Sequence, residues 1–255
     1  MSRERKKTMY SYFSRVRFSE CDAEGTMKLT TLVDYLQDTA IFHSEDVGFS
    51  VRYMKEHHMA WMLASWQIVV RRMPVYAEKI EVITNPHGVE RFIGYRNFKI
   101  LGKDGEECVV ANSVWALMDL ETAKPVVASQ EMIDAYGIGE KFEMDYAPRK
   151  IRLPEASLFT ERAPFSAQPW HLDSNRHVNN GAYIHMAWNY VPRAEGSIAD
   201  FDTEAGFREI RAEYKNQAHL GEVICPKVAV LEEGRHMIVD LQREDGKSFA
   251  VVEFL

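Results

Sequence analysis

The chain contains the same short series of markers twice, and this duplication limits its fold more than any other feature. Each copy has an aspartate ahead of an apolar helical stretch, then a small residue followed by Glu, then an Asp-Gly turn. The paired markers are Asp22 and Asp173, Ala77-Glu78 and Gly221-Glu222, and Asp104-Gly105 and Asp245-Gly246. Their separation shortens from 151 to 144 to 141 residues, as expected if the second copy has shorter loops. The pattern therefore predicts two units of one design within 255 residues.

Each copy is predicted to hold one helix followed by several strands. Apolar residues recur at three- and four-residue spacing over 31–46, Thr31 with Asp34 resembles a capping box, and Gly48 ends the helix. Runs rich in Val, Ile and aromatic residues follow, which is typical of strands. The predicted strands of the first copy are 61–72, 79–84, 91–101 and 106–119; the second copy has a helix at 181–190 and strands at 207–217, 222–232, 236–243 and 247–254.

This element order predicts an α+β fold in which an antiparallel sheet wraps around each helix. We expect residues 1–130 to form the first unit, 131–160 a connector and 161–255 the second unit. A sheet curled around a helix leaves a slot between them, which suits a long apolar ligand.

Composition and charge exclude several classes of protein. With 46% apolar and 27% charged residues, the chain has the composition of a folded globular protein. A net charge of −7 argues against nucleic-acid binding, which needs a concentrated basic surface. No apolar stretch approaches the roughly 20 residues that cross a bilayer, so no membrane span is expected. The amino terminus lacks a secretory pattern, and we expect a cytoplasmic protein.

Cysteine and histidine usage predicts neither a metal site nor a cofactor. Three widely spaced cysteines without a CxxC pair suit reduced thiols. These cysteines are Cys21, Cys108 and Cys225. The histidines that lack metal-ligand spacing, and that we expect at the surface or at helix ends, are His43, His57, His58 and His87.

The densest polar cluster lies just ahead of the second predicted helix. It places Asp173, Asn175 and His177 within five residues. Together with the N–H groups of the helix amino terminus, these side chains could supply a base and an oxyanion site. A polar loop that only caps the helix, with Asn179 or Asn180 as the N-cap residue, explains the cluster equally well.

The corresponding loop of the first copy lacks the amide and the imidazole. Glu24 stands where the second copy has Asn175, and Thr26 stands where it has His177. A duplicated fold with one such cluster suggests that one half performs chemistry while the other shapes a binding slot.

The run from Leu172 to Asn180, with Tyr183-Ile184, resembles the signature of acyl-acyl-carrier-protein (acyl-ACP) thioesterases, plant-type and bacterial enzymes with a double hotdog fold. Further matches are Leu36-Gln37, Val47-Gly48-Phe49-Ser50, Trp61, Trp115, the run from Asp119 to Thr122, and Glu213-Tyr214-Lys215. The resemblance extends from about residue 10 to the end of the chain. It implies an acyl-chain-binding hotdog at 1–130 and a catalytic hotdog at 161–255.

The resemblance also implies which residues catalyse. Asp173, Asn175 and His177 match the family's catalytic Asp, Asn and His, whereas Gln217 and Ala218 stand where the family has Glu and Cys. Alanine offers no nucleophile, so we expect direct attack by water held by Asn175 and Gln217. His177, oriented by Asp173, would be the base; the alternative is Asp173 as the base with His177 polarising the substrate. Helix N–H groups near Asn179 and Gly181 would stabilise the oxyanion.

The substrate implied by the resemblance is an acyl chain on acyl carrier protein, released as a free fatty acid to end its synthesis. An acyl-CoA thioesterase and a non-catalytic acyl-chain binder remain alternatives. The carrier is acidic, so the acidic chain would meet it through a local basic patch, and a homodimer is compatible with the sequence. The candidate basic residues, each otherwise a solvated charge, are Arg71, Arg72, Arg149, Lys150, Arg152 and Arg176.

Overall fold

The computed structural model describes residues 8–197, 201–204 and 206–255. The first half of the described chain has one long helix, one short helix and five strands. Its elements are β1 (Tyr10–Arg15), α1 (Leu29–Asp46), α2 (Val51–Glu56), β2 (Met59–Val70), β3 (Lys79–Glu90), β4 (Ile93–Leu101) and β5 (Glu107–Asp119).

The second half repeats this order in a shorter form. Its elements are β7 (Phe165–Ser166), α4 (Asn180–Trp188), β8 (Glu209–Tyr214), β9 (Val223–Leu231), β10 (His236–Gln242) and β11 (Ser248–Phe254). Between the halves lie α3 (Gln130–Tyr136) and β6 (Phe159–Glu161).

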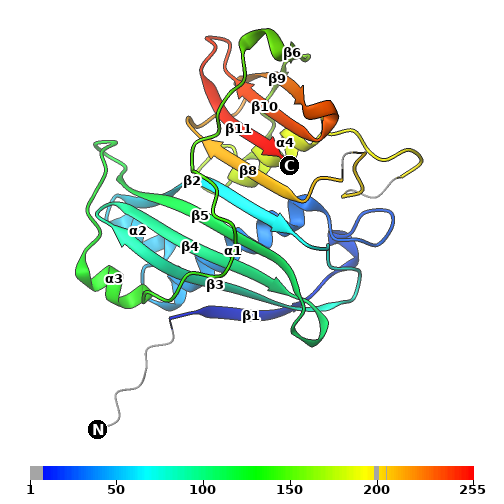
Figure 1. Cartoon of the computed structure of the whole chain (residues 1–255). Helices are drawn as coiled ribbons and strands as arrows, with labels where there is room; N and C mark the ends of the chain where they lie inside the picture. Colours follow the sequence, from blue (N-terminus) through cyan, green and yellow to red (C-terminus); the bar gives the residue numbers. More distant parts are fainter. Residues whose placement is uncertain (1–7, 198–200, 205) are drawn as a thin grey trace.

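All strands join one antiparallel sheet, with α1 and α4 packed on one face (Figure 1). The strand order is β1-β3-β4-β5-β2-β8-β11-β10-β9-β6, and the short β7 also pairs with β9. Counted inward from either edge, equivalent strands of the two halves follow in the same order. The halves meet at the centre, where β2 pairs with β8, from Ser65 opposite Glu213 to Val69 opposite Glu209. The expected α+β fold, a double hotdog, is confirmed.

The backbone hydrogen bonds show the duplication directly. Asp22 N–H donates to Thr26 O at 2.8 Å, and Asp173 N–H donates to His177 O at 2.9 Å. At the next marker, Ala77 and Gly221 both have positive φ, 63° and 80°. Each copy therefore has a turn of the same backbone conformation at this point. The small residue at this marker is explained by that conformation, which large side chains rarely adopt.

The helix α1 is held by its apolar face rather than by its cap. Leu32 and Leu36 are fully buried against the sheet, and each contributes about 2 kcal/mol through burial of its side chain. The predicted capping box is wrong: the helix begins at Leu29 after Lys28, which forms no side-chain cap. The Thr31 hydroxyl instead donates to the Glu20 carbonyl at 3.3 Å.

Several predicted boundaries differ from the structure. The strand predicted at 79–84 continues to Glu90 through an irregularity in its register between Pro86 and Gly88. The strand predicted at 207–217 ends at Tyr214, so Gln217 lies in the loop that follows. Helices α2 and α3, of six and seven residues, were not predicted because short helices carry little periodicity.

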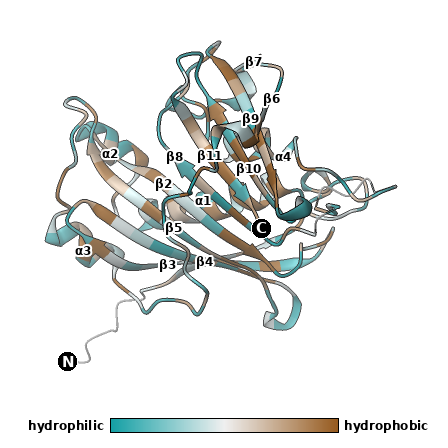
Figure 2. Ribbon diagram, turned by 45° about the horizontal axis from the view of Figure 1, so that its top comes forward, coloured by the Kyte–Doolittle hydropathy of each residue, from teal (hydrophilic) through white to brown (hydrophobic). Residues whose placement is uncertain are grey.

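The connector between the halves crosses the sheet face opposite α1 (Figure 1). The Gln67 side chain on β2 donates to Asp145 O at 2.7 Å and accepts from Ala147 N–H at 2.9 Å. On β4, Asn97 Oδ1 accepts from Phe142 N–H and from the Tyr146 hydroxyl. These buried amides tie the crossing segment to β2 and β4. Apolar residues run along the strands themselves (Figure 2). None of the described helices is long and apolar enough to cross a bilayer.

Candidate active site

A pocket of about 340 Å³ lies between α1, α2 and the sheet of the first half. Its volume is in the range of small-molecule sites. Most of the wall is apolar: Ala40, Ile41, Phe49, Val51, Met54, Met59, Ala60, Trp61, Val89, Trp115 and Leu120 line it. The second half contributes Asp173, Ser174, Asn175 and Asn180 at one end. The polar cluster predicted from the sequence therefore meets the apolar slot of the other half.

The loop that carries this cluster is held in shape by Asp173. The Asp173 Oδ1 atom accepts from the N–H groups of Asn175 at 2.8 Å and of His177 at 3.4 Å. Arg176 adopts a left-handed conformation, φ 65°, at the tip of the turn. A carboxylate that binds backbone N–H groups fixes a turn, so Asp173 presents Asn175 to the pocket.

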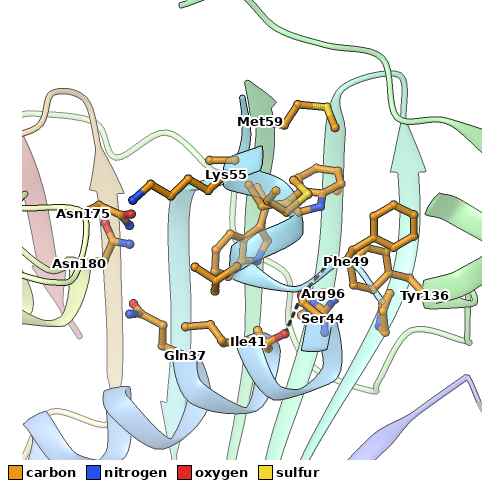
Figure 3. A pocket seen from close by; sticks show the side chains of 18 of the residues that line it. Gln37, Ile41, Ser44, Phe49, Lys55, Met59, Arg96, Tyr136, Asn175 and Asn180 are labelled. Atoms are coloured by element: carbon orange, nitrogen blue, oxygen red, sulfur yellow. Dashed lines mark hydrogen bonds between the residues drawn. The ribbon is translucent and has the colours of Figure 1, made fainter. Parts of the chain in front are cut away.

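Two polar residues of the first half face this end of the pocket, and neither was predicted. Gln37 on α1 has a buried Oε1 without a hydrogen-bond partner among the described residues. Lys55 on α2 extends its ammonium group toward Asn175 (Figure 3). Gln37 is part of the matched dipeptide Leu36-Gln37, whereas no sequence pattern indicates that Lys55 lies near the cluster.

The remaining predicted residues, His177 and Gln217, do not line the pocket. His177 packs its ring edge-on against His219, with the ring centres 4.7 Å apart. Gln217 is exposed in the loop after β8, and it is not among the residues that line the pocket. Its neighbour Ala218 is buried, and its N–H donates to the Tyr183 hydroxyl at 2.8 Å. The structure thus brings Asp173 and Asn175 together at the pocket, with His177 next to them on the same loop.

The amino terminus of α4 is capped by a side chain of the preceding residue. Asn179 is the N-cap residue, and its Oδ1 accepts from Gly181 N–H at 2.8 Å. The expectation that the Gly181 N–H stabilises an oxyanion is therefore wrong, because that group is already bound. Asn180, the first residue of α4, turns its side chain toward Asn175 (Figure 3).

His43 lies in the last turn of α1, in agreement with the expected helix-end position, but it is not at the surface. It is buried on α1 at 3% exposure, and its Nδ1 accepts from Arg96 Nη1 at 3.0 Å. Burial, reinforced by the Arg96 charge, lowers the pKa of His43 to about 3, so the imidazole is neutral. Among the described residues, no group of His, Cys, Asp and Glu is arranged to hold a metal ion.

The cysteines lie away from the pocket. Cys21 and Cys108 are buried, and Cys225 on β9 is half-buried. Burial raises the pKa of Cys21 and brings that of Cys108 to about 11. A buried thiol with a raised pKa is a poor nucleophile.

Of the candidate basic residues, Arg71 and Arg72 are held by ion pairs within the chain. Arg71 binds Glu107 at 2.8 Å, and Arg72 binds Glu78 and Glu106 at 2.7 Å each. The other four candidates, Arg149, Lys150, Arg152 and Arg176, are exposed to solvent, and so is Arg71 despite its ion pair.

Comparison with known proteins agrees with this arrangement. The family model described as the acyl-ACP thioesterase N-terminal domain matches residues 6–136. A chloroplastic acyl-[acyl-carrier-protein] hydrolase of Cuphea viscosissima is 28% identical over 66% of this chain and 44% of its own length. A chloroplastic oleoyl-acyl carrier protein thioesterase of Coriandrum sativum is 27% identical over 70% of this chain and 52% of its own length. The chain spans about half the length of these relatives.

Solved structures share the fold over almost the whole chain. An acyl-ACP thioesterase from Bacteroides thetaiotaomicron superposes with a TM-score of 0.83 at 23% identity and covers 97% of both chains. The 12:0-ACP thioesterase from Umbellularia californica gives a TM-score of 0.78 at 18% identity and covers 97% of this chain and 96% of its own. Because the family model covers half of the sequence and the fold extends over the rest, the chain belongs to the acyl-ACP thioesterase family.

Proposed function

We propose that the protein hydrolyses the thioester between an acyl chain and acyl carrier protein, releasing a free fatty acid and ending its synthesis. The observation that carries this proposal is the position of Asp173 and Asn175 at the end of an apolar pocket built by the other half. An acyl chain in the pocket would place its thioester at these residues. Membership of the acyl-ACP thioesterase family supports the same reaction.

In the proposed mechanism, water attacks the thioester carbonyl directly. Asn175 holds the water, and His177 accepts its proton as the oxyanion forms. The C–S bond then breaks, the thiolate takes the proton, and the acid leaves the pocket. Asp173 is assigned to orientation, because its Oδ1 already accepts backbone N–H groups of the same loop. Asp173 as the base, with His177 polarising the carbonyl, is the alternative that a pH profile of the His177→Gln variant tests.

Gln217 keeps its proposed role as a second ligand of the water. Its exposed position in the loop after β8 means that this role requires the loop to bring the amide to Asn175 when substrate binds. An amide can hold water by hydrogen bonds but cannot accept its proton, which leaves proton transfer to His177 or Asp173. We expect Gln217→Ala to lower kcat more than it changes KM.

The experiment that tests the function compares matched acyl chains on carrier protein and on CoA. We expect a kcat/KM at least about tenfold higher for the carrier-bound chain, equivalent to about 1.4 kcal/mol. Equal or better turnover of acyl-CoA would favour the acyl-CoA thioesterase. Binding without turnover of any thioester would favour a non-catalytic acyl-chain binder.

Two further predictions belong to this proposal. The protein is proposed to act in the cytoplasm, although the plant relatives named above are chloroplastic. Whether two copies form a homodimer stays a prediction, and sedimentation of the purified chain measures it.

A further inference from the structure

The end of the pocket opposite Asn175 contains a buried guanidinium group. Arg96 on β4 is 9% exposed and lines the pocket. Its side chain lies with Ser44 and Tyr136 at one end, while Asn175 and Asn180 lie at the other (Figure 3). An acyl chain whose thioester sits at Asn175 would therefore direct its far end toward Arg96.

Every contact that Arg96 makes is with a neutral group. Its Nη1 atom donates to His43 Nδ1 at 3.0 Å and to Thr84 Oγ1 at 3.3 Å. Its guanidinium carbon lies 5.3 Å from the centre of the Tyr136 ring. Since His43 is neutral, as shown by its lowered pKa, none of these groups compensates the charge.

The charge on Arg96 persists in this environment. Burial lowers the pKa of Arg96 to about 10, which still leaves the group protonated at neutral pH. Among the described residues Arg96 has no carboxylate partner, unlike Arg72, which binds Glu78 and Glu106. A buried charge is costly unless it is paired. Among the described residues nothing neutralises this cation, whereas an anionic ligand in the pocket could.

A second unpaired donor lies close to this cation. The Trp61 indole lies near the Tyr136 hydroxyl, but its buried Nε1 has no partner at hydrogen-bond distance among the described residues. Trp61 also lines the pocket. The Tyr136 hydroxyl itself is engaged with Ser44 Oγ at 2.9 Å. This end of the pocket thus offers the indole N–H of Trp61 and the positive charge of Arg96 to a ligand.

We propose that the preferred acyl chain ends in a carboxylate, so that the substrate is the monothioester of an α,ω-dicarboxylic acid. The far carboxylate would bind the Arg96 guanidinium by charge-assisted hydrogen bonds. A methyl end would instead leave the cation desolvated and unpaired. This proposal rests on the proposed function in one respect: it assumes that the thioester of the substrate lies at Asn175.

The test compares pairs of acyl-ACP substrates with the same number of carbons, one ending in methyl and one in carboxylate. We expect the carboxylate member to have a kcat/KM at least about tenfold higher at one or more chain lengths. If no length gives a tenfold preference, the proposal is wrong while hydrolysis of the methyl-ended chains would still support the proposed function.

A binding measurement separates the two proposals. Free α,ω-dicarboxylic acids should raise the Tm of the wild-type protein more than monocarboxylic acids of equal length, whether or not any thioester is hydrolysed. Replacing Arg96 by Met should abolish the difference, whereas Arg235→Met, at an exposed site away from the pocket, should keep it. If Arg96→Met does not fold, Trp61→Phe removes the indole donor together with part of the ring. It should reduce the Tm advantage of dicarboxylic over monocarboxylic acids, since the added space is the same for both acids. An unchanged difference in a folded Arg96→Met or Trp61→Phe variant would overturn the proposal.

Discussion

At the scale of single residues, Asn175 and its neighbour Ser174 form a matched pair. Both line the pocket on the same loop, but only Asn175 is assigned to holding the attacking water. We expect Asn175→Ala to lower kcat by about a hundredfold or more with little change in KM, because water must be oriented in the transition state. Ser174→Ala should stay within a few fold of wild type. Equal losses in both variants would mean that the loop matters only for its shape.

The buried His43 predicts how stability depends on pH. Its folded pKa, about 3, lies below the ordinary value of about 6.5 in an unfolded chain. Between these values the unfolded state binds one more proton, so stability is lost as the pH falls below about 6.5, at about 1.4 kcal/mol per pH unit.

The His43→Gln variant keeps an acceptor for Arg96 but binds no proton. Between pH 7 and pH 5, wild type should lose about 2 kcal/mol more of its unfolding free energy than this variant, as measured by urea denaturation. If the unfolding free energies of the two proteins change equally with pH, His43 is not a buried neutral imidazole.

At the scale of elements, the approach of α1 to α4 depends on Gly181. A Cβ atom at this position would lie 3.2 Å from Val33 Cγ1, and Val33 is a buried, branched residue that cannot easily rotate. We expect Gly181→Ala to destabilise the fold by about 1 to 3 kcal/mol through overpacking. In a double-mutant cycle, Val33→Ala should relieve this cost by at least about 0.5 kcal/mol. If the destabilisations by Gly181→Ala and Val33→Ala are simply additive, the cost of Gly181→Ala does not come from contact with Val33.

The elements also show what could be predicted and why. Asp-Gly turns and the Asp22 and Asp173 loops are local features, so they revealed the repeat without any knowledge of tertiary contacts. The extension of β3 beyond residue 84 was missed because Asn85 and Pro86 interrupt the apolar pattern. Both are held by partners distant in sequence: Asn85 Nδ2 donates to Glu140 O at 2.6 Å, and Pro86 pairs with Arg96.

Only part of the candidate site could be predicted from the sequence. Asp173 and Asn175 stand out because they cluster in the sequence. Gln37, Lys55 and Arg96 reach the pocket from α1, α2 and β4, and only folding brings them together. A single buried arginine inside an apolar strand leaves no pattern that distinguishes a pocket wall from a surface residue.

At the scale of the whole molecule, the proposed function requires an acidic chain to bind an acidic carrier. The candidate basic residues that are exposed on the connector and on the Asp173 loop are Arg149, Lys150, Arg152 and Arg176. We expect reversal of these four charges to raise KM for acyl-ACP by about tenfold and to leave acyl-CoA turnover largely unchanged. Lys103→Glu, in the exposed β4–β5 hairpin, is the control. Added salt should raise KM for wild type, because exposed charges are screened beyond about 8 Å at physiological ionic strength.

An unchanged KM in the fourfold variant, or a KM independent of salt, would show that the carrier binds elsewhere. A comparable rise for Lys103→Glu would show that only the net charge of the protein matters.

The pairing of β2 with β8 also limits how a ligand reaches the pocket. Main-chain hydrogen bonds join the two halves along the centre of the sheet, and α1 packs against α4 across the same boundary. Spreading the halves apart would break this ladder and expose the core. Under the proposed function, we therefore expect an acyl chain to enter lengthwise, tail first past Asn175, and to leave by the same route in reverse. Release of a long product would then slow with each added methylene, even where the chemical step is unaffected by chain length.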